Sequence, residues 1–134
     1  MEDKILIDTS AWIEFFRKKD LGIYTLVVKL LKEKQAVGSG TIALELIRGG
    51  RTSKELNYLN DLFEVIEMVY PNPNSYLLAG KMGYALARKG HTLNVVDLLI
   101  AQQAIENNLT LLTLDNHFKI IQKNSSLRLY KAPD

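Results

Sequence analysis

Residues 4–16 read KILIDTSAWIEFF, an apolar run that ends in an acid and passes at once into a pattern of helical spacing. The run 4–8 predicts a short buried strand that ends at Asp8. Thr9 and Ser10 can cap the helix that follows, whose aromatic residues at 12, 15 and 16 are expected in the core or in an interface. This stretch therefore predicts a strand-to-helix unit with a carboxylate at the junction.

The alternation of strand and helix patterns continues along the chain. Helical spacing predicts helices around 23–31, at 42–47 up to Gly49-Gly50, from Ser53 onward, around 79–86 up to Gly90, and from Asn94 to about Asn108. Strands are predicted at 35–38, 63–69, 109–114 and 127–130, with a turn at Pro71-Asn72-Pro73. Such an order predicts one α/β domain, residues 1–134, with a mainly parallel sheet covered by helices on both faces.

Composition excludes several classes of protein. The chain has 134 residues, a formal net charge of +2 and no cysteine, which excludes a disulfide scaffold, a thiolate zinc site and a cysteine nucleophile. Its two histidines are too few nitrogen ligands for a structural zinc site. No apolar run approaches the roughly 18 residues of a membrane span, and the N-terminus lacks the pattern of a signal peptide. We expect no membrane association and a cytoplasmic location.

The charge is unevenly distributed between the two halves of the chain. Residues 68–133 carry seven basic side chains but only three acidic ones, which are Asp97, Glu106 and Asp115. Two of these acids follow or open predicted buried elements. The presence of an acid in a buried element needs a physical explanation, because burying an unpaired carboxylate costs free energy.

Four carboxylates are predicted to meet at one edge of the sheet. Asp8 and Asp115 end predicted strands, Glu45 lies one turn into the third helix, and Asp97 lies in the first turn of the helix that starts near Asn94. Ligands of open parallel sheets bind outside the carboxyl ends of the strands. Four carboxylates there would repel one another unless a cation compensates them, and the hard ions Mg²⁺ and Mn²⁺ prefer oxygen ligands. Such a site can hydrolyse phosphodiesters by activating water.

Each acid also has a purely structural explanation. Asp97 could interact with the amide groups of its own helix, Asp115 could cap the short helix that contains Phe118, and Asp8 could satisfy backbone donors after its strand. Glu45 could form a surface ion pair with Arg48, three residues on. The joint placement of the four acids favours the metal site over these separate explanations.

The same motifs carry a family resemblance. The runs ILIDTSAWI (5–13), ELIRG (45–49), DLLIA (97–101) and LTLDNHF (112–118) closely resemble those of a PIN-domain ribonuclease, and within that family those of a VapC toxin of a type II toxin–antitoxin pair. The resemblance implies a three-layer α/β/α fold with four to five strands. It implies that Asp8, Glu45, Asp97 and Asp115 form the acidic quartet, with Ser10 and Thr113 supporting it by hydrogen bonds.

The resemblance also implies a mechanism and partners. Asp8, Asp97 and Asp115 would hold Mg²⁺ or Mn²⁺, and Glu45 would orient or deprotonate the attacking water in RNA cleavage. The expected partners are an RNA substrate, a small VapB-like antitoxin and a second copy of the chain. Where many members have an acid before the last Phe of the motif, this chain has His117.

Two further features and two rival functions stay open at this point. The basic residues Arg48, Arg51 and Lys54, together with those at 17–19, are candidate contacts for RNA phosphates or simply a solvated surface. His117 is either a surface histidine or faces the site or RNA. The rival functions are a catalytically silent PIN-fold module that binds RNA or protein, and a receiver-type phosphoacceptor domain, which the lack of an acid after the run 68–71 disfavours.

Overall fold

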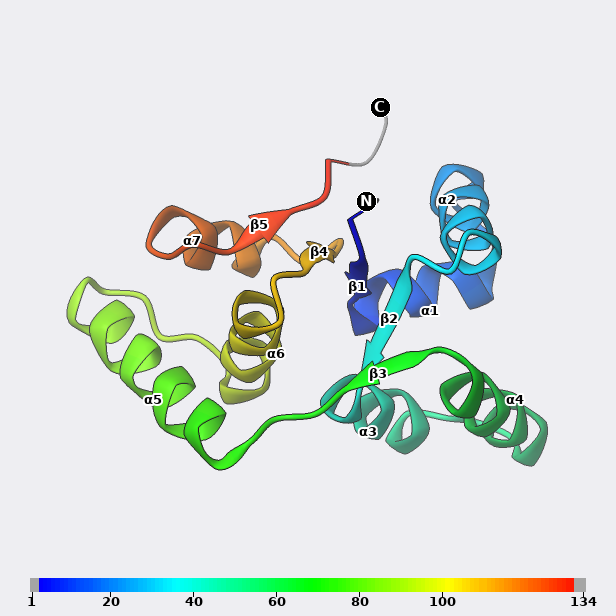
Figure 1. Cartoon of the computed structure of the whole chain (residues 1–134), viewed down its shortest axis with the longest axis horizontal. Coiled ribbons are helices and arrows are strands. Elements are labelled where there is room, and N and C mark those ends of the chain that lie inside the picture. The colour runs from blue at the N-terminus through cyan, green and yellow to red at the C-terminus, as the bar shows by residue number, and fades with distance from the viewer. Residues whose placement is uncertain (1–2, 132–134) are drawn as a thin grey trace.

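A computed structural model describes residues 3–131, so the first two and last three residues of the predicted domain lie outside the described part. The described residues form five strands and seven helices (Figure 1). In chain order these elements are β1 (Ile5–Ile7), α1 (Thr9–Arg17), α2 (Leu21–Lys32), β2 (Ala36–Ser39), α3 (Gly40–Arg48), α4 (Ser53–Val65), β3 (Glu67–Val69), α5 (Pro73–Arg88), α6 (Val95–Glu106), β4 (Thr110–Leu112), α7 (His117–Lys123) and β5 (Arg128–Leu129). Within residues 3–131, no helix is long and apolar enough to cross a membrane.

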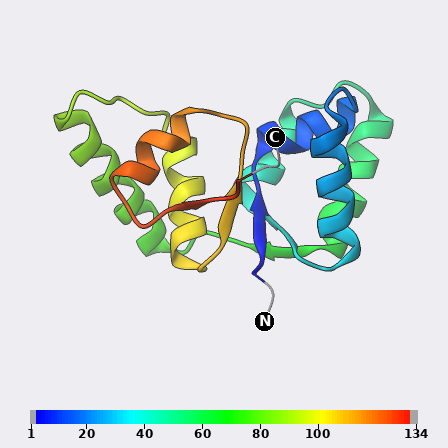
Figure 2. The same ribbon diagram turned by 90° about the horizontal axis from the view of Figure 1, so that it is seen from above.

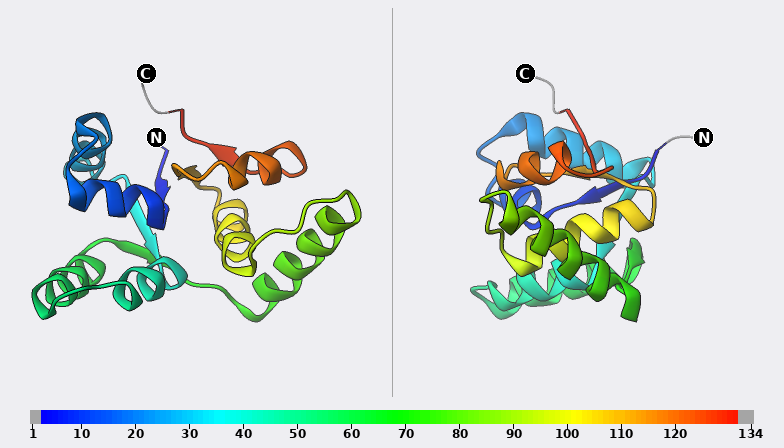
Figure 3. Two further views of the ribbon diagram at one scale, coloured as in Figure 1. Left: turned by 180° about the vertical axis from the view of Figure 1, so that it is seen from behind. Right: turned by 90° about the vertical axis from the view of Figure 1, so that its left-hand side faces the viewer.

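The five strands form one parallel sheet of order β3-β2-β1-β4-β5. From β1 the chain moves across the sheet in one direction to β3 and then returns past β1 to β4 and β5. Connections of one hand then place α1–α4 on one face and α5–α7 on the other. Figures 2 and 3 show these two groups of helices on opposite sides of the strands. The predicted three-layer α/β/α architecture is confirmed.

The strand order reverses at the boundary between β1 and β4. These two strands pair in parallel, with Ile5 opposite Thr110 and Ile7 opposite Leu112, and their carboxyl ends point to the same edge (Figure 2). Such a reversal leaves a crevice in which ligands of α/β sheets bind. The order also differs from the 2-1-3-4-5 order of receiver-type domains, which contradicts the rival phosphoacceptor function.

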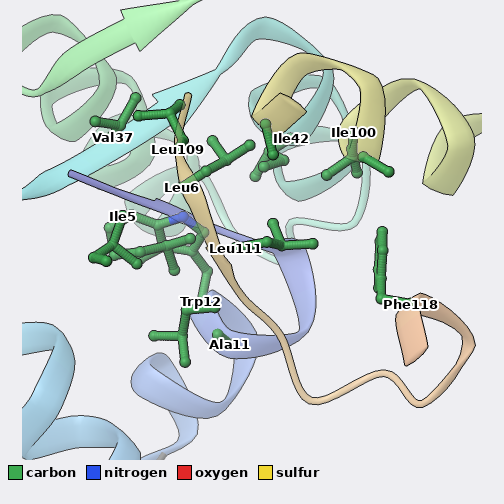
Figure 4. Packing of buried hydrophobic residues seen from close by; sticks show 14 of the residues in the cluster. Ile5, Leu6, Ala11, Trp12, Val37, Ile42, Ile100, Leu109, Leu111 and Phe118 are labelled. Atoms are coloured by element: carbon green, nitrogen blue, oxygen red, sulfur yellow. The ribbon is translucent and has the colours of Figure 1, made fainter. Parts of the chain in front are cut away.

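The core joins side chains from both helical layers and from the sheet. Leu6 of β1, Val37 of β2 and Leu111 of β4 share one buried cluster with Trp12 of α1 and Ile100 of α6 (Figure 4). All five side chains are fully buried. Strands buried on both faces read as continuous apolar runs, which is why residues 5–7 carry no alternation. The prediction that the aromatic residues of α1 lie in the core or in an interface is confirmed for Trp12 and Phe15, whereas Phe16 is exposed.

Two of the predicted strands have wrong boundaries. The strand predicted at 63–69 is limited to β3, because α4 continues to Val65 and turns Leu59, Leu62 and Phe63 toward the core. Helical packing of this apolar face outweighs the strand preference of single residues. The strand predicted at 109–114 ends at Leu112, since the Leu114 amide bonds the Ser10 hydroxyl rather than a neighbouring strand.

The helix starts also differ in detail from expectation. Thr9 and Ser10 do not cap α1 but lie inside its first turn, and Asp8 occupies the N-cap position without a side-chain cap bond. The predicted turn at 71–73 leads directly into α5, because Asn72 and Ser75 form a capping box and Pro73 takes a first-turn position that needs no amide donor.

Helices α5 and α6 approach closely at Gly83. A Cβ atom built there would lie 2.6 Å from Cδ1 of the buried Leu98, whereas one built at Gly80 on the same helix would meet nothing within 4 Å. Leu98 follows Asp97 directly in α6. The absence of a side chain at Gly83 therefore sets how near α5 lies to the helix that carries Asp97.

Alanine at these two glycines gives a matched test. Both substitutions gain about 0.5–1 kcal/mol from helix propensity, so this gain cancels in the comparison. We expect Gly83→Ala to be less stable than Gly80→Ala by about 1–3 kcal/mol, the usual cost of overpacking a core. Equal urea midpoints for the two variants would contradict the close approach.

Candidate metal centre

Four acids come to one edge of the sheet from four different elements. Asp8 follows β1, Glu45 lies in α3, Asp97 is the third residue of α6, and Asp115 follows β4 before α7. Asp8 is buried with 4% of its surface exposed, and the other three are half-buried. In Figure 2 the carboxyl ends of β1 and β4 and the start of α6 lie at the same edge. The edge is the crevice created by the reversal of strand order.

Asp8 is held by two hydroxyl groups that donate to the same oxygen. Ser10 Oγ donates to Asp8 Oδ2 at 2.8 Å and Thr113 Oγ1 donates to the same atom at 2.7 Å. The Asp8 amide donates to the Leu112 carbonyl at 2.9 Å, which extends the pairing of β1 with β4 by one residue. The carboxylate is thereby fixed at the point where the two strands end.

Each of these hydroxyls also accepts a bond from the backbone. The Leu114 amide donates to Ser10 Oγ at 2.9 Å, and the Asp115 amide donates to Thr113 Oγ1 at 3.0 Å. Hydrogen bonds to a charged acceptor are stronger than neutral ones. The loop after β4 is therefore tied to the Asp8 carboxylate through Ser10 and Thr113, which is the contact that the resemblance implies for these two residues.

Glu45 is oriented by a residue that the sequence prediction missed. Thr9 Oγ1 donates to Glu45 Oε1 at 2.7 Å across α1 and α3. Within residues 3–131, Glu45 forms no ion pair with Arg48, so its purely structural explanation is not supported. The position of Thr9 directly after Asp8 indicated a place near the site. Its hydroxyl was instead expected to cap the first helix.

Asp115 has both a structural contact and a place in the cluster. Its Oδ1 accepts from the His117 amide at 2.9 Å, but the N-cap of α7 is Asn116, so the predicted N-cap role of Asp115 is wrong. The His117 ring approaches the same oxygen, with Nδ1 at 3.0 Å. Asp97, Asp115 and His117 each offer one ligand atom, and these three atoms lie within 4.8 Å of one another.

The electrostatics of Asp97 show that the four acids act on one another. Burial, together with the negative charges of Asp115, Asp8 and Glu45, raises the pKa of the Asp97 carboxyl from 3.8 to about 6, against an opposing effect of His117. In the described part of the chain, no donor bonds the Asp97 carboxylate and no lysine or arginine pairs with any of the four acids. The cluster is thus short of positive charge.

Two of the three candidate phosphate contacts line a hollow that includes none of the four acids. Arg51 and Lys54 line a hollow of about 760 Å³ between α1, α2 and α4, together with Arg17, Lys18 and several aromatic residues. None of the four acids lines this hollow, and neither does Arg48. The side chains of Arg48, Arg51 and Lys54 are exposed. Their contact with RNA phosphates remains a prediction.

The comparisons with known proteins agree with this geometry. The PIN domain model matches residues 5–124. Ribonuclease VapC1 of Methanocaldococcus jannaschii is 31% identical over 134 residues, which covers 96% of this chain and 88% of that protein.

Two solved structures share the fold. The VapBC-1 structure from nontypeable Haemophilus influenzae has a TM-score of 0.75 at 26% identity and covers 95% of this chain and 96% of that one. VapBC2 from Rickettsia felis, bound to a DNA fragment from their promoter, has a TM-score of 0.76 at 24% identity and covers 94% and 96%. Because the family model spans most of the chain and a VapC relative aligns along nearly all of it, the chain belongs to the PIN domain family, among its VapC ribonucleases.

Proposed function

We propose that this chain is a Mg²⁺- or Mn²⁺-dependent endoribonuclease and the toxin of a type II toxin–antitoxin pair. The observation that carries the proposal is the convergence of Asp8, Glu45, Asp97 and Asp115 without a lysine or arginine partner among residues 3–131. The family membership and the name ribonuclease of the relative from Methanocaldococcus jannaschii support the same activity.

The donor atoms at the site fit a hard divalent cation. Asp8, Asp97 and Asp115 would hold it, because carboxylate oxygens are the ligands that Mg²⁺ and Mn²⁺ prefer and because positive charge relieves the repulsion on Asp97. A bound ion of this kind polarises a phosphoryl oxygen and lowers the pKa of water.

Glu45 is the proposed base. Thr9 donates to one of its carboxylate oxygens and thereby fixes the direction of the other, which has no hydrogen-bond partner among the described residues. That oxygen would accept the proton of the water that attacks phosphorus, while the bond from phosphorus to the leaving oxygen of RNA breaks. General base catalysis of this kind contributes about 10²–10⁴-fold to a rate.

We propose the partners and setting on the same basis. Solved relatives of this fold are VapBC complexes, which supports a small VapB-like antitoxin as partner and a hetero-oligomer with it. A homodimer, a single PIN domain over residues 1–134 and a cytoplasmic location complete the proposal. Arg48, Arg51 and Lys54 would contribute affinity for RNA phosphates without sequence choice.

RNA cleavage tests the activity directly. With Mn²⁺ present, we expect the purified protein to cut RNA internally, and we expect EDTA to stop the cleavage. Asp97→Asn should lower the rate about 100-fold or more, because loss of an inner ligand costs at least as much as loss of an outer one. Asp61→Asn, an exposed acid of α4, is the matched control. Cleavage that persists in EDTA would exclude the metal mechanism, and no cleavage in any metal would favour the silent module.

The raised pKa of Asp97 predicts an effect on stability that is independent of activity. The folded protein binds this proton more tightly than the unfolded chain, so stability is lost as pH rises from about 4 to about 6. In EDTA at pH 7.5, Asp97→Asn should therefore be more stable than the wild type by about 1 kcal/mol, a value reduced for solvent screening of a half-buried group. At pH 4 the two should unfold at the same urea concentration. A less stable variant at pH 7.5 would contradict the electrostatic argument.

The hydroxyl groups that bond Asp8 predict that a residue which does not itself bind the ion still affects metal affinity. Thr113→Val removes one donor to Asp8 Oδ2 and the acceptor of the Asp115 amide. We expect Mn²⁺ affinity, measured by calorimetry, to fall about 10–100-fold. Thr110→Val, on the strand that Thr113 follows, should leave it unchanged. Equal affinities for the two variants would show that Thr113 does not position the site.

A further inference from the structure

His117 lies beside Asp97 and Asp115 of the acidic cluster. It is the first residue of α7, and its side chain is 67% exposed, whereas the next residue, Phe118, is fully buried in the core. The buried Phe118 side chain therefore anchors the start of α7, where His117 lies. The His117 amide bonds Asp115 Oδ1 and fixes the same turn from the other side.

The spacing of the donor atoms fits one six-coordinate ion. With bonds of about 2.1–2.2 Å, neighbouring ligand atoms lie about 3 Å apart and opposite ones about 4.4 Å apart. Nδ1 of His117 lies 3.0 Å from Oδ1 of Asp115, which is the spacing of neighbours. Asp97 joins these two residues with all three ligand atoms inside 4.8 Å. One cation can contact all three side chains after a shift of a few tenths of an ångström, since the bound of 4.8 Å slightly exceeds the separation of opposite ligands.

We propose that His117 is a direct ligand of the bound ion and that its nitrogen makes the site prefer Mn²⁺ over Mg²⁺. This inference rests on the proposed metal-dependent function. A carboxylate cluster alone distinguishes these two ions poorly, since both accept oxygen ligands. An imidazole nitrogen is a softer donor that suits transition metals, while Mg²⁺ retains a strong preference for oxygen.

The alternative role for His117 is to hold Asp115 without touching the ion. An outer imidazole that donates Nδ1–H to a ligating carboxylate is a common arrangement around metals. The two roles differ in one observable property, which is whether a nitrogen nucleus is bonded to the metal. Spectroscopy of the bound ion can therefore decide between them without any measurement of RNA cleavage.

Pulsed electron paramagnetic resonance of the Mn²⁺-loaded protein is the deciding experiment. We expect the wild type to show the coupling of one directly bonded ¹⁴N nucleus and His117→Asn to lose it. His91→Asn, which changes the other histidine of the chain, should keep it. A wild type that binds Mn²⁺ without this coupling, or a coupling that persists in His117→Asn, would overturn the assignment.

Metal selectivity gives a second measurement on the same variants. Replacing the nitrogen donor by oxygen in His117→Asp should reduce the preference for Mn²⁺ over Mg²⁺ by about tenfold or more, measured as the ratio of the two dissociation constants. An unchanged ratio would overturn the selectivity. If the wild type binds neither ion, the proposed metal-dependent function fails as well, whereas binding without nitrogen coupling overturns the role of His117 alone.

Discussion

Like-charge repulsion at the carboxyl edge of the sheet is the constraint around which this molecule is organised. Burial and three neighbouring carboxylates raise the pKa of Asp97 to about 6, so the acids are held together against their own charge. The energy that holds them comes from elsewhere, from the apolar cluster that joins Leu6, Leu111 and Trp12 beneath the site. In such a domain the functional site lowers the stability of the fold, and packing in the core compensates for it.

The parallel sheet determines where the four acids lie. The reversal of strand order between β1 and β4 opens a crevice, and the two residues that follow these strands, Asp8 and Thr113, are joined by a hydrogen bond of 2.7 Å. The helices then bring the remaining acids to the same edge, Glu45 from one face and Asp97 from the other. Each acid is carried by an element whose position is set by packing, which favours a preorganised site over one that must assemble on binding.

The sequence allowed much of this arrangement to be predicted, because apolar periodicity reports burial and the rule for strand ends reports where ligands bind. The strand-and-helix alternation was predictable from these patterns alone, and the acidic quartet from the strand-end rule together with the family resemblance. The hydrogen-bond partners of individual side chains were harder to predict from the sequence. Thr9 carries equally good signals for a helix cap and for a bond to Glu45, and only the packing of α1 against α3 decides between them. Phe63 likewise reads as a strand residue until its helical neighbours place it against the core.

The two hydroxyls on Asp8 limit the way in which this carboxylate can bind a cation. A carboxylate oxygen has two acceptor sites, and those of Asp8 Oδ2 are occupied by Ser10 and Thr113. Only the other oxygen is free, so Asp8 can coordinate through a single atom. Ca²⁺ takes six to eight oxygens and commonly grips carboxylates through both atoms, whereas smaller ions accept six ligands held one by one. The hydrogen bonds that fix Asp8 in place thereby also disfavour calcium at the site.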